Sequence, residues 1–113
     1  MTARFIVRAQ VVDPSVKPAF ERWYQDEHLP EACLAFKAKR AWRGWSDVEP
    51  SVHYAVYEFD DIAGARAISG SEALKHLVAE FNRLWGDKVT RTRDIVDAVQ
   101  SVGGATKDAT ASP

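Results

Sequence analysis

The spacing of apolar residues in this sequence switches between a period of two and a period of three to four, and the order of the switches leaves few possible folds. Residues 4–12 alternate between two faces and are rich in β-branched side chains, which predicts a strand. Residues 37–45 alternate in the same way, and residues 52–59 form the most strand-like segment of the chain. A last strand is predicted over residues 89–99. The short link between the second and third strands predicts a β-hairpin.

Helical spacing begins at Ala19, where a single helical face is predicted to carry Phe20, Trp23, Tyr24, Glu27 and His28. Pro30 disfavours helical geometry at the residue before it, so the helix is predicted to end near His28 or Leu29. A short helical turn could restart with Pro30 at its first position.

A second helical stretch follows the hairpin. Asp60 or Asp61 is predicted to cap a short helix over residues 62–69. Ser71 caps a longer one, which carries a core-facing stripe of apolar residues as far as Trp85 and stops at Gly86.

The order strand–helix–strand–strand–helix–strand predicts the α+β class and a ferredoxin-like β-α-β-β-α-β fold, in which a four-stranded antiparallel sheet carries both helices on one face. We expect one domain over residues 1–100 and a disordered tail over residues 101–113, which has little to bury. Apolar side chains on the other sheet face require a partner, so we expect a homodimer that closes sheet to sheet into a barrel. The candidates for that face are Ile6, Trp42 or Trp45, Tyr54 or Tyr57, and Val96.

Composition and charge argue against several classes of protein. A formal net charge of −1 and a pI of about 6.3 provide no global field that would attract nucleic acid or an anionic membrane. No apolar stretch approaches the length of a membrane span, and no leader segment is recognisable. The single cysteine, Cys33, fits a reducing compartment, so we expect a cytoplasmic protein.

With this topology, the segment FERWYQDEHLPE (residues 20–31) resembles the dimeric α/β-barrel superfamily, in particular its EthD-like or related uncharacterised branches, in which a histidine closes the first helix before a proline. The resemblance spans roughly residues 3–99. It implies a homodimer, and a role like those of cofactor-free monooxygenases, isomerases, polyketide cyclases or haem-binding proteins. His76 lies in the helix that carries an acid/base histidine in the plant polyketide cyclase, but the accompanying histidine-proline sequence is absent. The histidines do not reproduce the spacing of the haem-degrading branch.

His28 is the first catalytic candidate, because an imidazole titrates near neutrality and can act as an acid or a base. The alternative is that it only caps the helix C-terminus or bonds to Glu27 or Glu31. Tyr24 lies one turn earlier on the same face and is its candidate catalytic partner, or else a core aromatic residue.

Six further residues are candidate ligand contacts: Trp23, Arg40, Trp42, His53, Tyr57 and His76. His53 and Tyr57 share one face of their strand, but the sequence leaves open whether that face lies under the helices or lines the barrel. An arginine beside aromatic residues could hold a carboxylate or phenolate. Arg40, Arg43, Arg91 and Arg93 could do so, or could form ion pairs at a dimer rim. His76 could simply be exposed.

No metal site is predicted. Neighbouring His and Glu side chains diverge by about 100° on a helix, and no His-x-x-x-His pair is present. With no nucleotide motif either, we predict a small enzyme without a cofactor that acts on an aromatic or polyketide-like molecule as an isomerase, cyclase or monooxygenase. The alternative is a non-catalytic dimeric binding or accessory module for a small hydrophobic ligand such as haem. A purely structural dimer is a third possibility.

Overall fold

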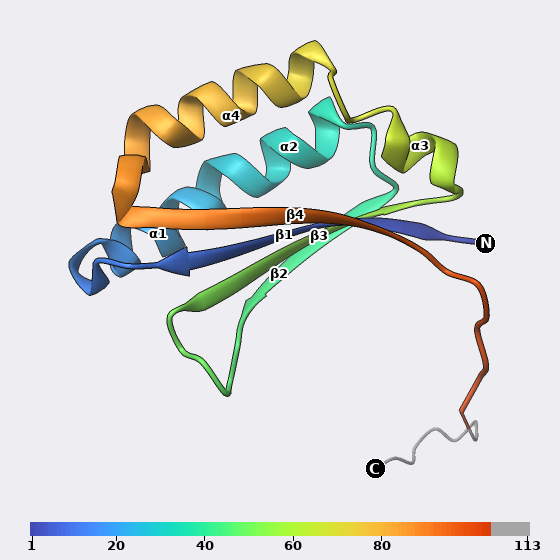
Figure 1. Ribbon diagram of the computed structural model, residues 1–113, viewed down its shortest axis with the longest axis horizontal. Helices are drawn as coiled ribbons and strands as arrows, with labels where there is room; N and C mark the ends of the chain where they lie inside the picture. Colours follow the sequence, from blue (N-terminus) through green and yellow to red (C-terminus); the bar gives the residue numbers. More distant parts are fainter. Residues whose placement is uncertain (105–113) are drawn as a thin grey trace.

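Four antiparallel strands form the sheet of the computed structural model, which describes residues 1–104 (Figure 1). The strands are β1 (Ala3–Val11), β2 (Arg40–Trp45), β3 (Val52–Phe59) and β4 (Val89–Asp97), in the spatial order β2-β3-β1-β4. The predicted hairpin joins β2 to β3, and β1 lies centrally between β3 and β4. The predicted ferredoxin-like fold is confirmed.

The helices lie on one face of this sheet (Figure 1). The N-terminal helix consists of α1 (Lys17–Trp23), a π-helical turn η2 (Tyr24–His28) and α2 (Leu29–Ala35), preceded by a 3-10 turn η1 (Pro14–Val16). The other long helix of this layer is α4 (Glu72–Trp85). It follows the short α3 (Ile62–Arg66) and precedes the 3-10 turn η3 (Gly86–Lys88). The predicted caps are present, since Asp61 and Ser71 each accept a hydrogen bond from a backbone N–H at 3.1 Å.

The prediction that the first helix ends before Pro30 is wrong, because the helix continues to Ala35. The predicted α-helical restart is present, since Pro30 lies in the first turn of α2. In a regular α-helix, the proline ring would clash with a carbonyl four residues earlier. Here the preceding turn is widened, and the N–H of Leu29 donates to the carbonyl of Tyr24, five residues back. The wider turn accommodates the proline. It also shifts the helical phase, so that His28 is buried whereas Glu27, predicted on the same face, is exposed.

The core lies between the helices and the covered sheet face. Phe20, fully buried, lies at its centre and meets Trp45, Phe81 and Trp85 with ring centroids 5.3–6.0 Å apart. On β3, the side chains of His53 and Tyr57 face this core. The question that the sequence left open is thereby answered: both lie beneath the helices, and the alternating residues of β3 face away.

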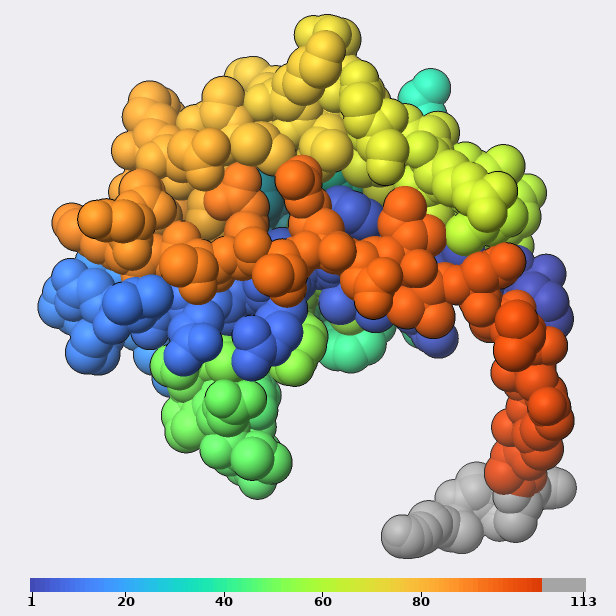
Figure 2. All heavy atoms as spheres, in the orientation of Figure 1, coloured from blue at the N-terminus to red at the C-terminus, as the bar shows by residue number. Residues whose placement is uncertain are grey.

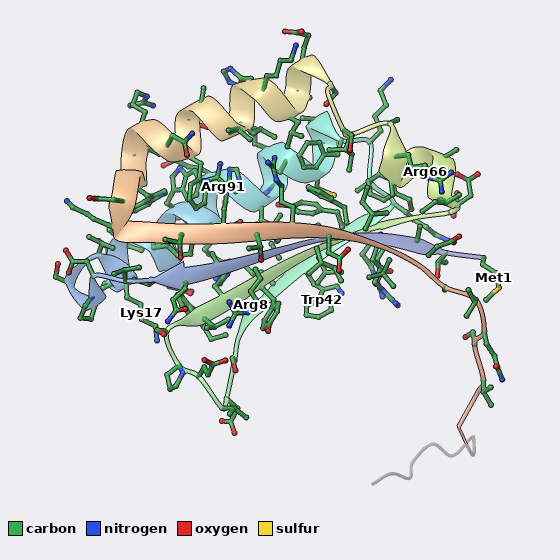
Figure 3. The ribbon with its side chains drawn as sticks, viewed as in Figure 1. Met1, Arg8, Lys17, Trp42, Arg66 and Arg91 are labelled. Carbon is green, nitrogen blue, oxygen red and sulfur yellow. The ribbon has the colours of Figure 1, made fainter. Side chains whose placement is uncertain are left out.

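The uncovered face of the sheet carries an apolar patch with charged margins. Its hollow, about 380 Å³, is lined by Ile6, Trp42, Tyr54 and Val56 together with Arg4, Gly44 and Trp45. Trp42 is 47% exposed and points away from the helices (Figure 3). The sequence left open which tryptophan of β2 and which tyrosine of β3 point to this face. They are Trp42 and Tyr54.

The chain leaves the sheet after β4 and extends away from the body of the molecule (Figure 2). Residues 98–104 contain no helix or strand. Most of the tail predicted to be disordered, residues 105–113, lies outside the described residues. Within residues 1–104, no helix combines the length and the apolar character that crossing a membrane would need.

Candidate functional site

A narrow cavity lies between the sheet and the helices. It measures about 30 Å³, which is room for one or two water molecules. Aromatic and aliphatic side chains of β1, β3 and α4 form most of its wall, and its polar lining comes from Tyr24, His28, Tyr57, Arg91 and Arg93. Five groups capable of proton transfer or hydrogen bonding thus meet in an otherwise apolar space.

A wider groove of about 510 Å³ adjoins the inner cavity. Phe5, Leu74 and Arg93 line both spaces, so these three side chains form the boundary between them. In Figure 2 the surface is hollowed between β4 and the segment that joins α3 to α4, and atoms of β1 are visible at its base. Gly70, with φ +73°, makes the turn at the rim of this groove.

His28 lies in the widened turn of the first helix and is only 7% exposed. Trp23 stacks on the imidazole with ring centroids 4.2 Å apart, and Tyr24 meets it edge-on at 4.8 Å. Its buried Nδ1 has no hydrogen-bond partner among the described residues. Burial, assisted by the positive charge of Arg91, lowers the pKa of His28 to about 4. The imidazole is therefore neutral at pH 7 and able to accept a proton.

Tyr24 and Tyr57 lie beside each other in the wall of the cavity, both almost fully buried. Burial raises the pKa of each phenol above its usual range. Both phenols are therefore protonated at neutral pH and can donate hydrogen bonds to an oxygen atom of a ligand.

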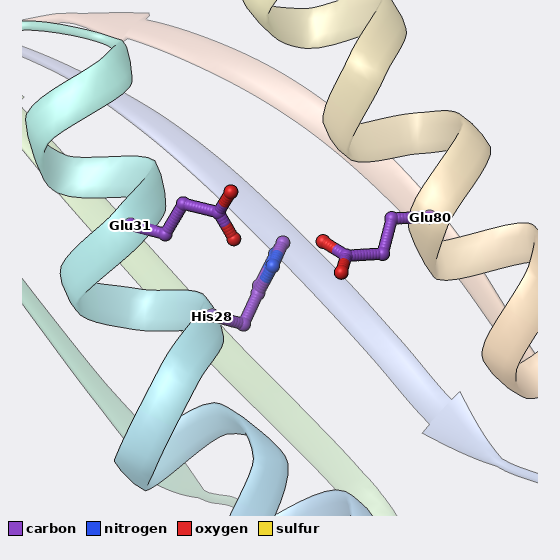
Figure 4. A group of neighbouring side chains, drawn as sticks. All are labelled: His28, Glu31 and Glu80. Atoms are coloured by element: carbon purple, nitrogen blue, oxygen red, sulfur yellow. The ribbon is translucent and has the colours of Figure 1, made fainter.

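Two carboxylates flank His28, as Figure 4 shows. Glu31 comes from α2 and Glu80 from α4, and one donor atom of each lies within 4.8 Å of the others and of an imidazole nitrogen. The Oε1 atom of Glu80 is buried without a hydrogen-bond partner, while its Oε2 lies 3.9 Å from Arg83. These carboxylates can orient a protonated imidazole. The imidazole nitrogen and the two carboxylates could together also hold a divalent cation.

His53 belongs to a separate network under the helices. Arg43 pairs with Glu21 through two hydrogen bonds of 2.7 and 2.9 Å, and its Nη1 lies 3.3 Å from His53 Nε2. Because a guanidinium can only donate, that nitrogen must accept, which leaves the proton on the buried, unpartnered Nδ1. Burial, with the charge of Arg43, lowers the pKa of His53 to about 4. His53 touches Tyr24, at 4.4 Å between ring centroids, but does not line the cavity.

The fold brings together only part of the predicted site. His28, Tyr24 and Tyr57 line one cavity, with Trp23 behind His28. Arg40 and Trp42 lie on the opposite face of the sheet, where both contact Glu58. His76 is exposed on α4.

The sequence analysis did not name Glu80, which α4 places beside His28. It named Arg91 and Arg93 without choosing between a ligand and an ion pair.

Comparison with known proteins supports the fold. No family model and no curated protein matches the sequence. Among solved structures, an EthD family protein from Bacillus halodurans shares 16% identity at a TM-score of 0.67, over 88% of this chain and 100% of its own. HapK from Hahella chejuensis shares 18% identity at a TM-score of 0.64, over 91% of this chain and 98% of its own. SnoaB from Streptomyces nogalater, a cofactor-independent oxygenase, shares 13% identity at a TM-score of 0.58, over 91% of this chain and 98% of its own.

The chain therefore has the ferredoxin-like fold that the sequence resemblance predicted, and an EthD family protein is among the solved structures that share this fold.

Proposed function

We propose that this protein is a small enzyme that acts on an aromatic or polyketide-like molecule without a cofactor, and that His28 is its acid/base. One observation carries the proposal: a neutral, buried imidazole with an unpartnered nitrogen in the wall of a cavity lined by aromatic residues. A polar group buried without a partner is costly, and such groups are concentrated at functional sites.

The chemistry begins with a proton transfer to His28 from an acidic C–H or O–H of the substrate. Tyr24 and Tyr57 donate hydrogen bonds to the oxygen on which negative charge develops, and Arg91 stabilises that charge. The resulting enolate or phenolate can be reprotonated elsewhere by imidazolium, which is isomerisation, or can close a ring. A phenolate of this kind is also the species that reacts with molecular oxygen.

Similar folds give this proposal limited support. SnoaB is described as a cofactor-independent oxygenase, and a protein from Nitrosomonas europaea with a TM-score of 0.59 as a putative antibiotic biosynthesis monooxygenase. At 13% and 14% identity these likenesses concern the fold, so the reaction has to be argued from the cavity itself.

Substrate binding requires the cavity to open, because about 30 Å³ is too small for an aromatic ring. Leu74 separates the cavity from the 510 Å³ groove and is only half-buried. We infer that the body of the substrate lies in the groove, and that Leu74 moves to admit the reacting ring to His28.

The functional unit in this proposal is a homodimer formed through the uncovered sheet face. The support is the apolar hollow around Trp42, which would be buried against a second copy. The active cavity lies on the other side of the sheet, so each protomer would hold a complete site.

Turnover of His28 variants tests the proposal. Oxygen uptake and solvent deuterium incorporation would be measured with a panel of phenolic and anthrone-type substrates. For any substrate that the wild type converts, His28→Asn should lower kcat roughly 10²- to 10⁴-fold, and Tyr24→Phe should lower it less. His76→Asn, at an exposed site, is the matched control. Full activity in His28→Asn would contradict the role of His28; ligand binding without any turnover would favour the binding-module alternative.

A further inference from the structure

Six arginines project from the strands of the sheet, and they differ in whether a carboxylate neutralises them. Four of them form ion pairs. Arg4 and Arg40 pair with Glu58, Arg8 pairs with Glu49, and Arg43 pairs with Glu21, at N–O distances between 2.7 and 3.4 Å.

Arg91 and Arg93 are the exceptions. Among residues 1–104 neither forms an ion pair with an acidic side chain. Arg91 donates one hydrogen bond, to the neutral amide of Asn82 at 3.2 Å, and its guanidinium lies 3.9 Å from the ring centroid of Phe81. The aromatic ring and the amide hold Arg91 in place without neutralising its charge.

Both exceptions lie at the cavity. Arg91 and Arg93 alternate with outward-facing residues on β4, so their side chains leave the same face of the strand, roughly 7 Å apart along it. Arg91 lines the inner cavity, and Arg93 lines both the cavity and the groove (Figure 3 labels Arg91). Two unneutralised guanidinium groups therefore mark the path from the groove to His28.

Removing a cation from water is costly unless an anion accompanies it. Arg91 bears part of this cost, because burial and the nearby charge of Arg93 lower its pKa. An anionic ligand that binds beside Arg91 would offset this cost. The carboxylates near the path are Asp94 in the groove and Glu31 and Glu80 beside His28, and they would repel an anion from either end. The position between the two arginines remains favourable for the anionic group of a ligand.

We propose that the ligand of this cavity is an aromatic anion, whose carboxylate or phenolate is held between Arg91 and Arg93 while its ring points toward His28. The inference rests on the proposed function, since it names the class of substrate for the same site. Paired guanidinium groups suit a carboxylate because each can donate charge-assisted hydrogen bonds to one of its oxygens.

Calorimetric titration with two probes of nearly equal shape tests the proposal. 1-Naphthoate carries the carboxylate, and 1-naphthylmethanol replaces it with a neutral hydroxymethyl group. The wild type should bind the naphthoate at least about tenfold more tightly. Arg93→Gln should remove most of that preference and leave the affinity for the alcohol unchanged. Arg91→Lys should keep part of it, and Arg22→Gln, an exposed charge change on α1, should keep all of it.

The outcomes separate this inference from the proposed function. Equal affinity of the wild type for both probes would overturn the anion preference and leave the aromatic site standing. A preference that survives in Arg93→Gln and in Arg91→Gln, with both variants folded by circular dichroism, would show that other groups hold the anion and would also overturn it. Failure of the wild type to bind either probe would overturn the ligand site itself.

Discussion

The indole of Trp23 lies nearly parallel to the imidazole of His28, with ring centroids 4.2 Å apart and planes inclined by 17°. The stack covers one face of the imidazole, excludes water from it, and fixes the direction in which its nitrogens point. In the proposed mechanism Trp23 is therefore a positioning residue for His28, and the widened turn between the two residues makes the stack possible.

Loss of the stack should change the titration of His28. In Trp23→Leu, water reaches the imidazole, so its pKa should rise from about 4 toward the ordinary value of 6.5. Trp23→Phe keeps an aromatic face and should keep most of the depression. Histidine-selective NMR over a pH titration measures both. An unchanged pKa in Trp23→Leu would show that burial by the remaining residues suffices.

Stability should fall as the pH falls through the range of the buried histidines. The folded-state pKa of His28 and of His53 is about 4 against 6.5 for an ordinary histidine, so the unfolded chain binds more protons below pH 6.5. Their contribution is complete above pH 6.5 and is lost as the pH approaches 4. Between pH 7.5 and 5 the loss should be about 2 kcal/mol for each histidine.

Urea denaturation across that pH range measures this effect. His28→Asn and His53→Asn should each flatten the dependence of unfolding free energy on pH, and His76→Asn, at an exposed position, is the control. Equal slopes in all four proteins would contradict the assignment.

Zinc should act as an inhibitor. The donors of His28, Glu31 and Glu80 lie within 4.8 Å of one another, so small movements of these side chains would bring them to Zn²⁺ at about 2 Å each. A bound ion would occupy the imidazole that the reaction needs. We expect Zn²⁺ to lower turnover, EDTA to restore it, and Glu31→Gln to weaken the inhibition. If EDTA alone abolished activity and Zn²⁺ restored it, the cofactor-free proposal would fail.

Dimerisation should depend on Trp42. Trp42→Glu places a charge in the apolar hollow of the uncovered face, where its 47% exposure means that the protomer itself should still fold. Sedimentation velocity should show a dimer for the wild type and a monomer for the variant. Leu34→Glu, at an 82% exposed apolar residue on α2, is the control and should remain dimeric. A monomeric wild type would exclude the sheet-to-sheet dimer.

The strands and their order along the chain were predictable because strand periodicity and turn residues are local signals. The sequence does not predict which face of β3 lies under the helices. His53 and Tyr57 on one side and Tyr54 and Val56 on the other are similarly apolar. Only the packing of the helices onto one side distinguishes the two faces.

The first helix shows a second limit of sequence reasoning. Pro30 is a reliable helix breaker in a regular α-helix, but a single widened turn removes the clash, and that turn leaves no simple signature in the sequence. His28 could be identified from its neighbours. The approach of Glu80 could not, because it depends on how α4 packs across the first helix.

The central claim is that His28 meets a ligand in the cavity, and the most direct test is to follow the imidazole resonances of all three histidines while 1-naphthoate is added. Substitution of each histidine in turn assigns the signals. The claim predicts that His28 shifts strongly, that His53 shifts weakly through its contact with Tyr24, and that His76 does not move. Saturable binding that leaves the His28 signals unchanged would contradict it.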